Sequence, residues 1–201
     1  MTRPYVQRAR AESAVATQRR MIEAARSVLT TGEVPRLELA DVAERAGIAR
    51  STVYLSFGTR SAFMTKILDD SLHRAGFSRI REHIVLPDAL EAMEKTLTET
   101  AVMYSTEHAV LQRMLLLAKL DRDVAQDYQV RQKRRAAGMR VLAKRLRGQG
   151  RLRANVSVEA AAAVLWILTS FETFDQLFSG WSLDASKCGL RLVMIARSSL
   201  L

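Results

Sequence analysis

The sequence predicts an all-α protein of about nine helices, and three features of its composition and patterning favour that class. Glycine and proline number only 9 and 3 among 201 residues. Alanine, leucine, arginine and glutamate are abundant, and these residues lose little side-chain freedom when they enter a helix. No alternating run of β-branched residues is long enough to indicate a strand.

The chain is strongly basic, with a formal net charge of +10 and a pI of about 10.4. A protein of this kind usually meets a polyanion, so nucleic acid is the first candidate partner. The single cysteine, Cys188, excludes an internal disulfide and suits a reducing compartment. The longest apolar run, at 160–168, is far shorter than the roughly 20 residues of a membrane span. We therefore expect a cytoplasmic protein with no membrane partner.

Helical signals in the first third of the chain predict a small helical domain behind a basic arm. Its expected parts are a flexible arm over 1–16, helices over 17–31, 38–46 and 50–57, and a connecting fourth helix from residue 60. Met21, Ala25 and Leu29 recur on one face of the first of these helices. Gly47 ends the second, and Thr59 is suited to cap the fourth.

Longer and more apolar helices follow a shift in composition near residue 80. They are expected at about 88–104, 108–119, 122–148, 157–179 and 184–199. Pro87 and the glycines at 148 and 180 mark breaks between them. The chain therefore divides into a helix-turn-helix domain over 17–64 and a larger helical domain over 65–201.

Residues 39–60 carry the pattern that points most clearly to a function. Val42 gives the first short helix an apolar face, and Gly47 supplies the positive φ that a tight turn needs. Val53 and Phe57, four residues apart, direct the second helix toward the core. The outward face of the second helix then carries Arg50, Ser51, Thr52, Tyr54, Leu55 and Ser56. Such a face is suited to enter the major groove of DNA.

This stretch resembles the TetR family of transcriptional regulators over residues 17–64. The matching positions are Ile22, Ala24 and Ala25, Val42 and Ala43, Ala46 to Ala49, Thr52 to Tyr54, Phe57 and Arg60. The resemblance implies a homodimer that binds a palindromic operator in double-stranded DNA, represses transcription and is released by a small apolar or amphipathic effector. It also implies that Thr52, Tyr54 and Arg60 contact phosphates, while Arg50 and Ser51 lie nearest the base edges. Leu55 offers only apolar contact, for instance to a thymine methyl group.

Two departures from the family pattern keep an alternative open. Glu38 stands where the family usually has Thr or Ser, and its carboxylate would repel an approaching phosphate. Ala49 replaces the usual Ser that caps the recognition helix, a loss of about 1 kcal/mol. The alternative is a helical ligand-binding or scaffold protein with the same fold but without specific operator binding.

An enzyme is a weaker interpretation of the same residues. The three histidines, His73, His83 and His108, lie far apart in the sequence, without spacing typical of a metal site or a catalytic triad. No glycine-rich phosphate loop is present either. We therefore expect no catalytic residue, no metal and no cofactor.

In the larger domain, apolar stripes predict a dimer face and an effector pocket. The dimer face is expected on the last two helices because they are apolar on more than one side. Its predicted residues are Val164, Leu168, Phe171, Phe174, Phe178, Leu192 and Ile195. The pocket is expected where methionines and aromatic residues gather, since these adapt to irregular apolar ligands. Its candidates are Met93, Leu97, Met103, Tyr104, Met114, Leu117, Tyr128, Trp166 and Phe171.

A basic run at 131–153 contains no acidic residue and carries as many positive charges as the whole chain's net charge. It is therefore open to two interpretations. The first is the solvated face of one amphipathic helix, with Met139, Leu142 and Leu146 buried behind it. The second is a site that attracts an anionic ligand, such as an acyl-coenzyme A, or a second contact with nucleic acid.

Overall fold

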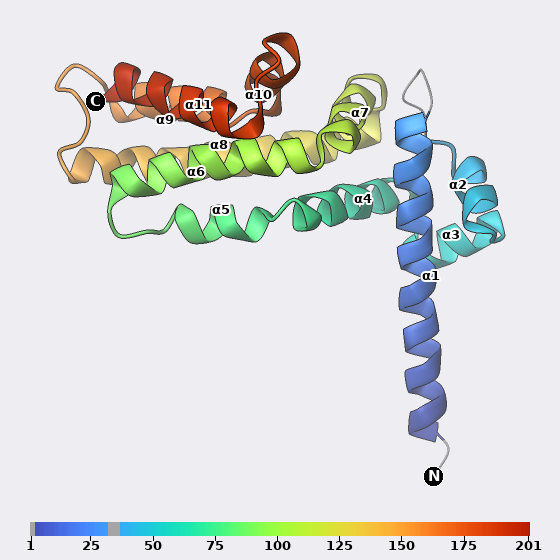
Figure 1. The fold of residues 1–201 in the computed structure, drawn as a ribbon. Helices are drawn as coiled ribbons and strands as arrows, with labels where there is room; N and C mark the ends of the chain where they lie inside the picture. Colours follow the sequence, from blue (N-terminus) through green and yellow to red (C-terminus); the bar gives the residue numbers. More distant parts are fainter. Residues whose placement is uncertain (1–2, 32–36) are drawn as a thin grey trace. The chain divides into compact units, whose positions relative to one another are not determined.

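The computed structural model describes the backbone of residues 3–31 and 37–201 and the side chains of residues 12–31, 37–122 and 124–201. Over these residues the chain forms eleven α-helices, one π-helical turn and no strand, which confirms the all-α class (Figure 1). The elements are α1 (Arg3–Thr31), α2 (Leu39–Ala46), α3 (Arg50–Phe57), α4 (Arg60–Arg74), α5 (Phe77–His83), α6 (Ala89–Thr106), α7 (His108–Leu120), α8 (Arg122–Gly148), α9 (Val158–Leu168), α10 (Phe171–Asp175), η1 (Gln176–Gly180) and α11 (Ala185–Leu200). None of these helices has the combination of length and apolar character that a bilayer span requires.

The chain folds into two compact units whose limits differ from the expected boundary after residue 64. The first unit comprises Met1–Ser71 together with Gln112–Gln126, and the second comprises Leu72–Leu111 and Asp127–Leu201. The α7–α8 connection thus belongs to the first unit, although the sequence analysis assigned it to the larger domain. Met114, Leu117 and Val124 are buried there. Composition along the chain cannot show that a later segment belongs to the same compact unit as an earlier one.

Helix α1 corrects the prediction of a flexible arm over 1–16, because it begins at Arg3 rather than at Thr17. Residues 3–16 contain no glycine and are rich in Arg and Ala, which favour helix. Pro4 falls in the first turn, where the missing N–H has no partner to lose. The side chains of residues 12–16 are exposed, so this part of the helix has no apolar stripe that a pattern search could find.

In the second unit, α6 packs against α5 and α11, and α11 also contacts α9 (Figure 1). The contact between α6 and α11 is close at Gly189, where an added Cβ would lie 3.2 Å from the Thr98 Cα. Helix α8 is held beside these elements by long arginine side chains. Arg145 donates to the backbone carbonyls of Ile84 and Leu86, which follow α5.

Helix α5 is a second correction, since the sequence analysis placed no helix at 77–83. Gly76, with a φ of 81°, turns the chain between α4 and α5. Ile80 is the buried residue of this seven-residue helix. One buried side chain sets no period, so the helix could not be read from hydrophobic spacing.

The predicted helix over 157–179 is divided at Thr169 and Ser170. The Thr169 hydroxyl donates to the Leu165 carbonyl at 2.8 Å, and the Ser170 hydroxyl accepts from the Thr173 N–H at 3.1 Å. Side-chain hydroxyls therefore satisfy backbone groups at the end of α9 and the start of α10. The helix can therefore break at these two residues although the apolar pattern continues through α9, α10 and the π-helical turn.

Candidate functional site

The turn between α2 and α3 has the geometry that the sequence predicted. Gly47 lies in the left-handed region, with φ 64° and ψ 42°. Its N–H donates to the Glu44 carbonyl and the Ile48 N–H donates to the Ala43 carbonyl, both at 3.0 Å. This pair of bonds is a Schellman motif, which satisfies the last carbonyls of α2 and redirects the chain into α3.

Helix α3 buries Val53 and leaves its polar side toward solvent. Val53 is 1% exposed, whereas Tyr54 and Leu55 are 42% and 86% exposed. Arg50 and Ser51 are also exposed, and Thr52 and Ser56 are half-buried. Four of the six predicted DNA-contacting residues of α3 are therefore exposed within the first unit, and the other two are half-buried.

The ends of α3 and α4 show how this face is held. Ala49 begins α3 without a side-chain cap, as its methyl group dictates. Thr59 caps α4 as predicted, because its hydroxyl accepts from the Ala62 N–H at 3.1 Å. The rings of Phe57 and Phe63 pack with centroids 4.6 Å apart, joining the end of α3 to the buried side of α4.

Arg60, the predicted phosphate contact on α4, has a partner within its own unit. Its guanidinium donates to the carboxylate of Asp121, in the connection between α7 and α8. The two side chains keep 30% and 21% of their surface exposed. A phosphate that approaches Arg60 would therefore compete with a carboxylate already in place.

A cavity of about 370 Å³ opens in the second unit between α5, α6 and α8. Its apolar wall comprises Leu72, Phe77, Ile80, Ile84, Met103 and Met139. Its polar part comprises Arg81, Tyr104, Arg131, Gln132, Arg134 and Arg135, with Gly138 also in the lining. This volume lies within the range of small-molecule sites, and the mixture of wall types suits an amphipathic ligand.

The predicted pocket residues divide among several places. Met103 and Tyr104 line the cavity. Tyr128 and Trp166 line a second hollow of about 310 Å³, which shares Gln132 and Arg135 with the first. The other candidates are buried elsewhere: Met93 and Leu97 in α6, Met114 and Leu117 in the first unit, and Phe171 in α10.

Most of the cavity wall was not predicted from the sequence. Phe77, Ile80 and Ile84 belong to α5 or follow it directly, and that helix was not predicted. The arginines of α8 were noted as a basic run but not connected with a cavity. Their role depends on which helix lies opposite, and spacing along one helix does not carry that information.

Arg135 holds α8 to the end of α9 through neutral groups. Its guanidinium donates to the Thr169 hydroxyl at 2.8 Å, to the Trp166 carbonyl and to the Gln132 carboxamide oxygen at 2.5 Å. Its Cζ lies 4.9 Å from the centroid of the Trp166 ring. Burial lowers the pKa of Arg135, whereas burial raises the pKa of Tyr104 to about 12. Tyr104 therefore stays a neutral phenol, which donates to the Thr169 carbonyl at 3.0 Å.

The basic run is resolved into two groups of side chains. The first group has partners within the second unit: Arg131 pairs with Asp127 of the same helix, Arg135 donates to the Thr169 hydroxyl and the Trp166 carbonyl, Arg145 and Arg147 donate to backbone carbonyls, Arg151 pairs with Asp88, and Arg153 donates to the Ser198 carbonyl. The second group is exposed and comprises Lys133, Arg134, Arg140 and Lys144. The interpretation of one solvated helix face is therefore too simple, because many of these charges fasten loops and helix ends.

The predicted dimer-face residues lie mostly in the core of the second unit. Phe174 and Leu192 are 0% exposed, Leu168 is 4% exposed and Phe171 is 8% exposed. Val164 and Phe178 are half-buried, and Ile195 is 37% exposed. This part of the prediction needs correction, because an apolar stripe marks burial without saying whether the cover is the same chain or a second copy.

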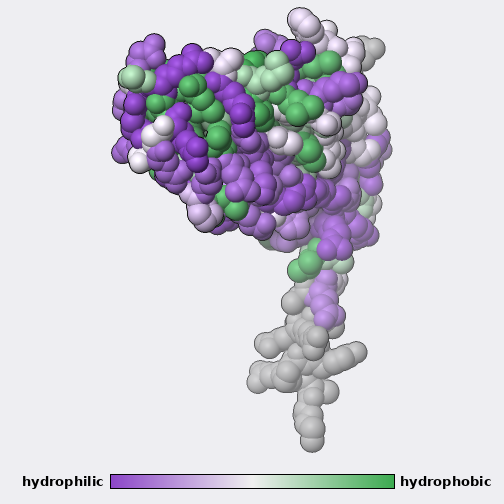
Figure 2. All heavy atoms as spheres, turned by 60° about the vertical axis from the view of Figure 1, so that its left-hand side comes forward, coloured by the Kyte–Doolittle hydropathy of each residue, from purple (hydrophilic) through white to green (hydrophobic). Residues whose placement is uncertain are grey.

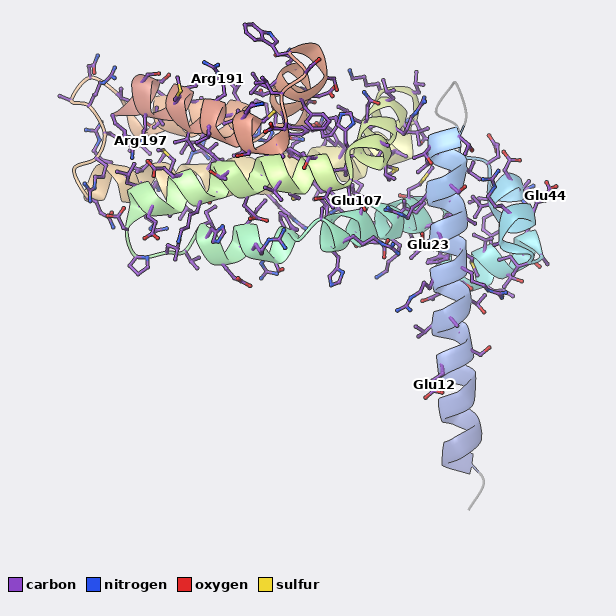
Figure 3. All side chains as sticks on the ribbon, viewed as in Figure 1. Glu12, Glu23, Glu44, Glu107, Arg191 and Arg197 are labelled. Atoms are coloured by element: carbon purple, nitrogen blue, oxygen red, sulfur yellow. The ribbon has the colours of Figure 1, made fainter. Side chains whose placement is uncertain are left out.

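A different set of apolar side chains on α9 and α11 is exposed. Ile167 is 51% exposed, Leu190 is 63% exposed and Met194 is 58% exposed. Figure 2 shows apolar side chains gathered among hydrophilic ones over the upper part of the second unit, where Figure 1 places these helices. Arg191 and Arg197 extend from α11 beside them, and Arg197 pairs with Glu94 of α6 (Figure 3). We call Ile167, Leu190, Met194 and Ile195 the α9–α11 apolar face.

His108 has polar neighbours in the fold that its spacing in the sequence did not indicate. Its Nε2 lies 2.6 Å from the Asp175 Oδ1 and 3.4 Å from the Ser179 Oγ, and its ring stacks on Phe171 at 5.5 Å. A catalytic triad needs the carboxylate on one ring nitrogen and the serine on the other. Here both approach Nε2, and the Ser179 hydroxyl donates to Asp175 at 2.6 Å. These three side chains therefore connect α7 to α10 and η1, and the Ser179 hydroxyl is not placed to be activated as a nucleophile.

No protein-family model and no curated protein matches the sequence of the chain. Solved structures do match its fold. NalD of Pseudomonas aeruginosa, the secondary repressor of the MexAB-OprM multidrug efflux pump, has a TM-score of 0.72 at 16% identity, covering 94% of this chain and 98% of that one. A TetR transcription regulator from Haloarcula marismortui has a TM-score of 0.69 at 14% identity, covering 93% and 99%. SmeT in complex with triclosan has a TM-score of 0.71 at 17% identity, covering 92% of each chain. The chain therefore has the fold of TetR-family transcriptional regulators, as the helix-turn-helix motif predicted.

Proposed function

We propose that this protein is a dimeric transcriptional repressor that binds a palindromic operator through α3 and releases it when a small molecule occupies the second unit. The observation that carries the proposal is the exposed polar face of α3, fixed by the Gly47 turn. Arg50 and Ser51 lie at the N-terminal end of this helix, the end that enters the groove in helix-turn-helix proteins. The shared fold supports the same function, because NalD is described as a repressor.

A homodimer is the assembly that this function requires. Two recognition helices must lie about 34–36 Å apart to enter successive major grooves on one side of a duplex. The α9–α11 apolar face offers the surface for such pairing, since a twofold axis repeats every apolar contact. The effector would occupy the cavity lined by α5, α6 and α8, and its binding would be linked to operator release by about 1–3 kcal/mol.

Operator binding is tested by fluorescence anisotropy with DNA from upstream of the protein's own gene and a scrambled duplex of equal length. Arg50→Ala should reduce the preference for the operator over the scrambled duplex by about 5- to 150-fold, because a bidentate arginine–guanine contact contributes about 1–3 kcal/mol. Tyr54→Phe should weaken both complexes to a similar degree, because it removes a phosphate contact.

Arg140→Ala is the matched control, because it removes one exposed positive charge from α8 in the second unit. It should leave both complexes nearly unchanged. If Arg50→Ala left the preference for the operator intact, the proposed base contact would be wrong. If wild-type protein showed no preference at any salt concentration, the operator function itself would fail.

Asp121→Asn tests the competition for Arg60. Asparagine keeps an oxygen that accepts from the Val124 N–H, as Asp121 does at 3.3 Å, but removes the charge that binds Arg60. Affinity for all DNA sequences should rise by up to about fivefold, because a partly exposed ion pair contributes about 0.2–1 kcal/mol. Asp127→Asn makes the same change in net charge next to Arg131 and is the control. Equal gains in the two variants would mean that net charge alone is responsible.

A second candidate is a ligand-binding protein of the same fold without specific operator binding. Three observations favour it: the missing cap at Ala49, the missing side-chain cap at Glu38 and the engagement of Arg60 by Asp121. All three reduce what the N-terminal ends of α2, α3 and α4 could offer to a phosphate group. In this case wild-type protein would bind an effector with normal affinity while discriminating poorly between operator and scrambled DNA.

A further inference from the structure

The cavity between α5, α6 and α8 carries an unusual balance of charge. Four arginines line it, Arg81, Arg131, Arg134 and Arg135, and no carboxylate is among the described lining residues. Arg131 is neutralised by Asp127 at 2.7 Å. Arg81 and Arg134 are exposed at the lining and have no charged partner in the described part of the chain. The mouth of the cavity is therefore positively charged.

Arg135 adds a positive charge that is less exposed than those of Arg81 and Arg134. In the described residues its acceptors are a carboxamide, a carbonyl and a hydroxyl, all of them neutral. Glu172 acts on Arg135 at longer range, and its carboxylate accepts from the Tyr128 hydroxyl at 3.0 Å. A half-buried guanidinium with neutral acceptors gains more from an anion than a fully solvated one does.

Gly138 and Ile84 lie where the cavity meets a neighbouring hollow of about 500 Å³, whose other lining residues are Val85, Pro87, Val141 and Arg145. An added Cβ at residue 138 would stand 3.8 Å from the Ile84 side chain, which is ordinary contact distance. A methylene chain does not fit between these two residues, because it needs a similar distance to each of them. The apolar part of a ligand would therefore lie against the wall of the first cavity, and a large side chain at residue 138 would enter the space that it needs.

We propose that the effector is an amphipathic anion, a single-chain carboxylate whose head group binds Arg134 and Arg81 and whose alkyl chain packs against the apolar wall of the cavity. This inference rests on the proposed function and defines its ligand class. A neutral ligand of the same shape gains the apolar contacts but leaves the arginines without a partner. A cationic one meets repulsion at the mouth.

Isothermal titration calorimetry with dodecanoate, dodecanol and dodecyltrimethylammonium tests the proposal on the full chain, below the critical micelle concentrations of the two ionic probes and below the solubility limit of dodecanol. Dodecanoate should bind at one site per chain. Dodecanol should bind about tenfold more weakly, the lower end of what a charge-assisted hydrogen bond contributes, and the cation should not bind measurably. Equal affinity for dodecanoate and dodecanol would overturn the proposal.

Two pairs of variants locate the site. Arg134→Ala should weaken dodecanoate binding about tenfold. Arg140→Ala should not, because Arg140 is an exposed arginine of the same helix that lies outside the lining. Gly138→Leu should block binding of the long chain, whereas Gly138→Ala should retain it with a more stable helix. Equal losses in Arg134→Ala and Arg140→Ala would overturn the site, since the effect would then be one of overall charge.

Operator binding in the presence of dodecanoate separates this inference from the proposed function. Release of the operator by dodecanoate but not by dodecanol supports both. Dodecanoate binding without release contradicts the proposed regulation and leaves the ligand class standing. Specific operator binding by a protein that takes up no dodecanoate contradicts the ligand class and leaves the regulator standing.

Discussion

Phe174→Ala should lower the free energy of unfolding by about 3–5 kcal/mol, which is the usual cost of removing a buried phenylalanine side chain. Phe174 is 0% exposed, and its ring lies 5.0 Å from that of Phe178 and 5.6 Å from that of Tyr104. Alanine would leave a cavity beside the Tyr104 ring, which is held in place by the hydrogen bond from its hydroxyl to the Thr169 carbonyl at 3.0 Å, so the surroundings could close over it only in part. Urea denaturation at constant protein concentration measures the change.

Phe77→Ala is the control for this substitution, because it removes the same group from a side chain that is 41% exposed. Its cost should be less than half as large. The sequence analysis placed Phe174 on the dimer face, and that interpretation predicts a different result. If Phe174→Ala left the unfolding of the monomer unchanged and raised the dimer dissociation constant instead, the core assignment would be wrong.

The double substitution Ile167→Glu and Met194→Glu should convert the protein to a monomer and reduce operator affinity by at least about 100-fold. A twofold axis places four new carboxylates in one interface, and each unpaired buried charge costs several kcal/mol. Monomers also lose the second recognition helix, so the operator contacts are halved. Sedimentation velocity gives the oligomeric state, and anisotropy gives the operator affinity.

Val130→Glu is the control for the interface, because Val130 is 46% exposed but lies on α8 rather than on α9 or α11. It should leave both the sedimentation coefficient and operator affinity nearly unchanged. A double variant that still sediments as a dimer would reject the α9–α11 apolar face. A monomeric double variant with full operator affinity would reject the proposed link between pairing and DNA binding.

The helix-turn-helix could be predicted because its signals are local. Gly47, Thr59 and the spacing of Val53 and Phe57 each act within one or two turns of chain, and the structure confirms each of them. Such features depend on backbone conformation and short-range hydrogen bonds, which the residue type largely decides.

The cavity and the dimer face could not be predicted in the same way. An apolar stripe shows that a helix is covered, but the identity of the cover depends on contacts between distant parts of the sequence. Phe174 and Ile167 lie only seven positions apart, and one is 0% exposed while the other is 51% exposed. Likewise, nothing along the basic run indicates that Arg135 reaches Trp166 and Arg145 reaches Ile84.

The inclusion of residues 112–126 in the first unit has a practical consequence for dissecting the protein. A fragment cut after residue 71 would lose Met114, Leu117 and Val124, which are buried in the intact chain, together with Asp121, the partner of Arg60. Such a fragment would expose apolar side chains that are covered in the intact chain, and we expect it to aggregate. Transferring the first unit to another protein therefore requires two stretches of sequence rather than one.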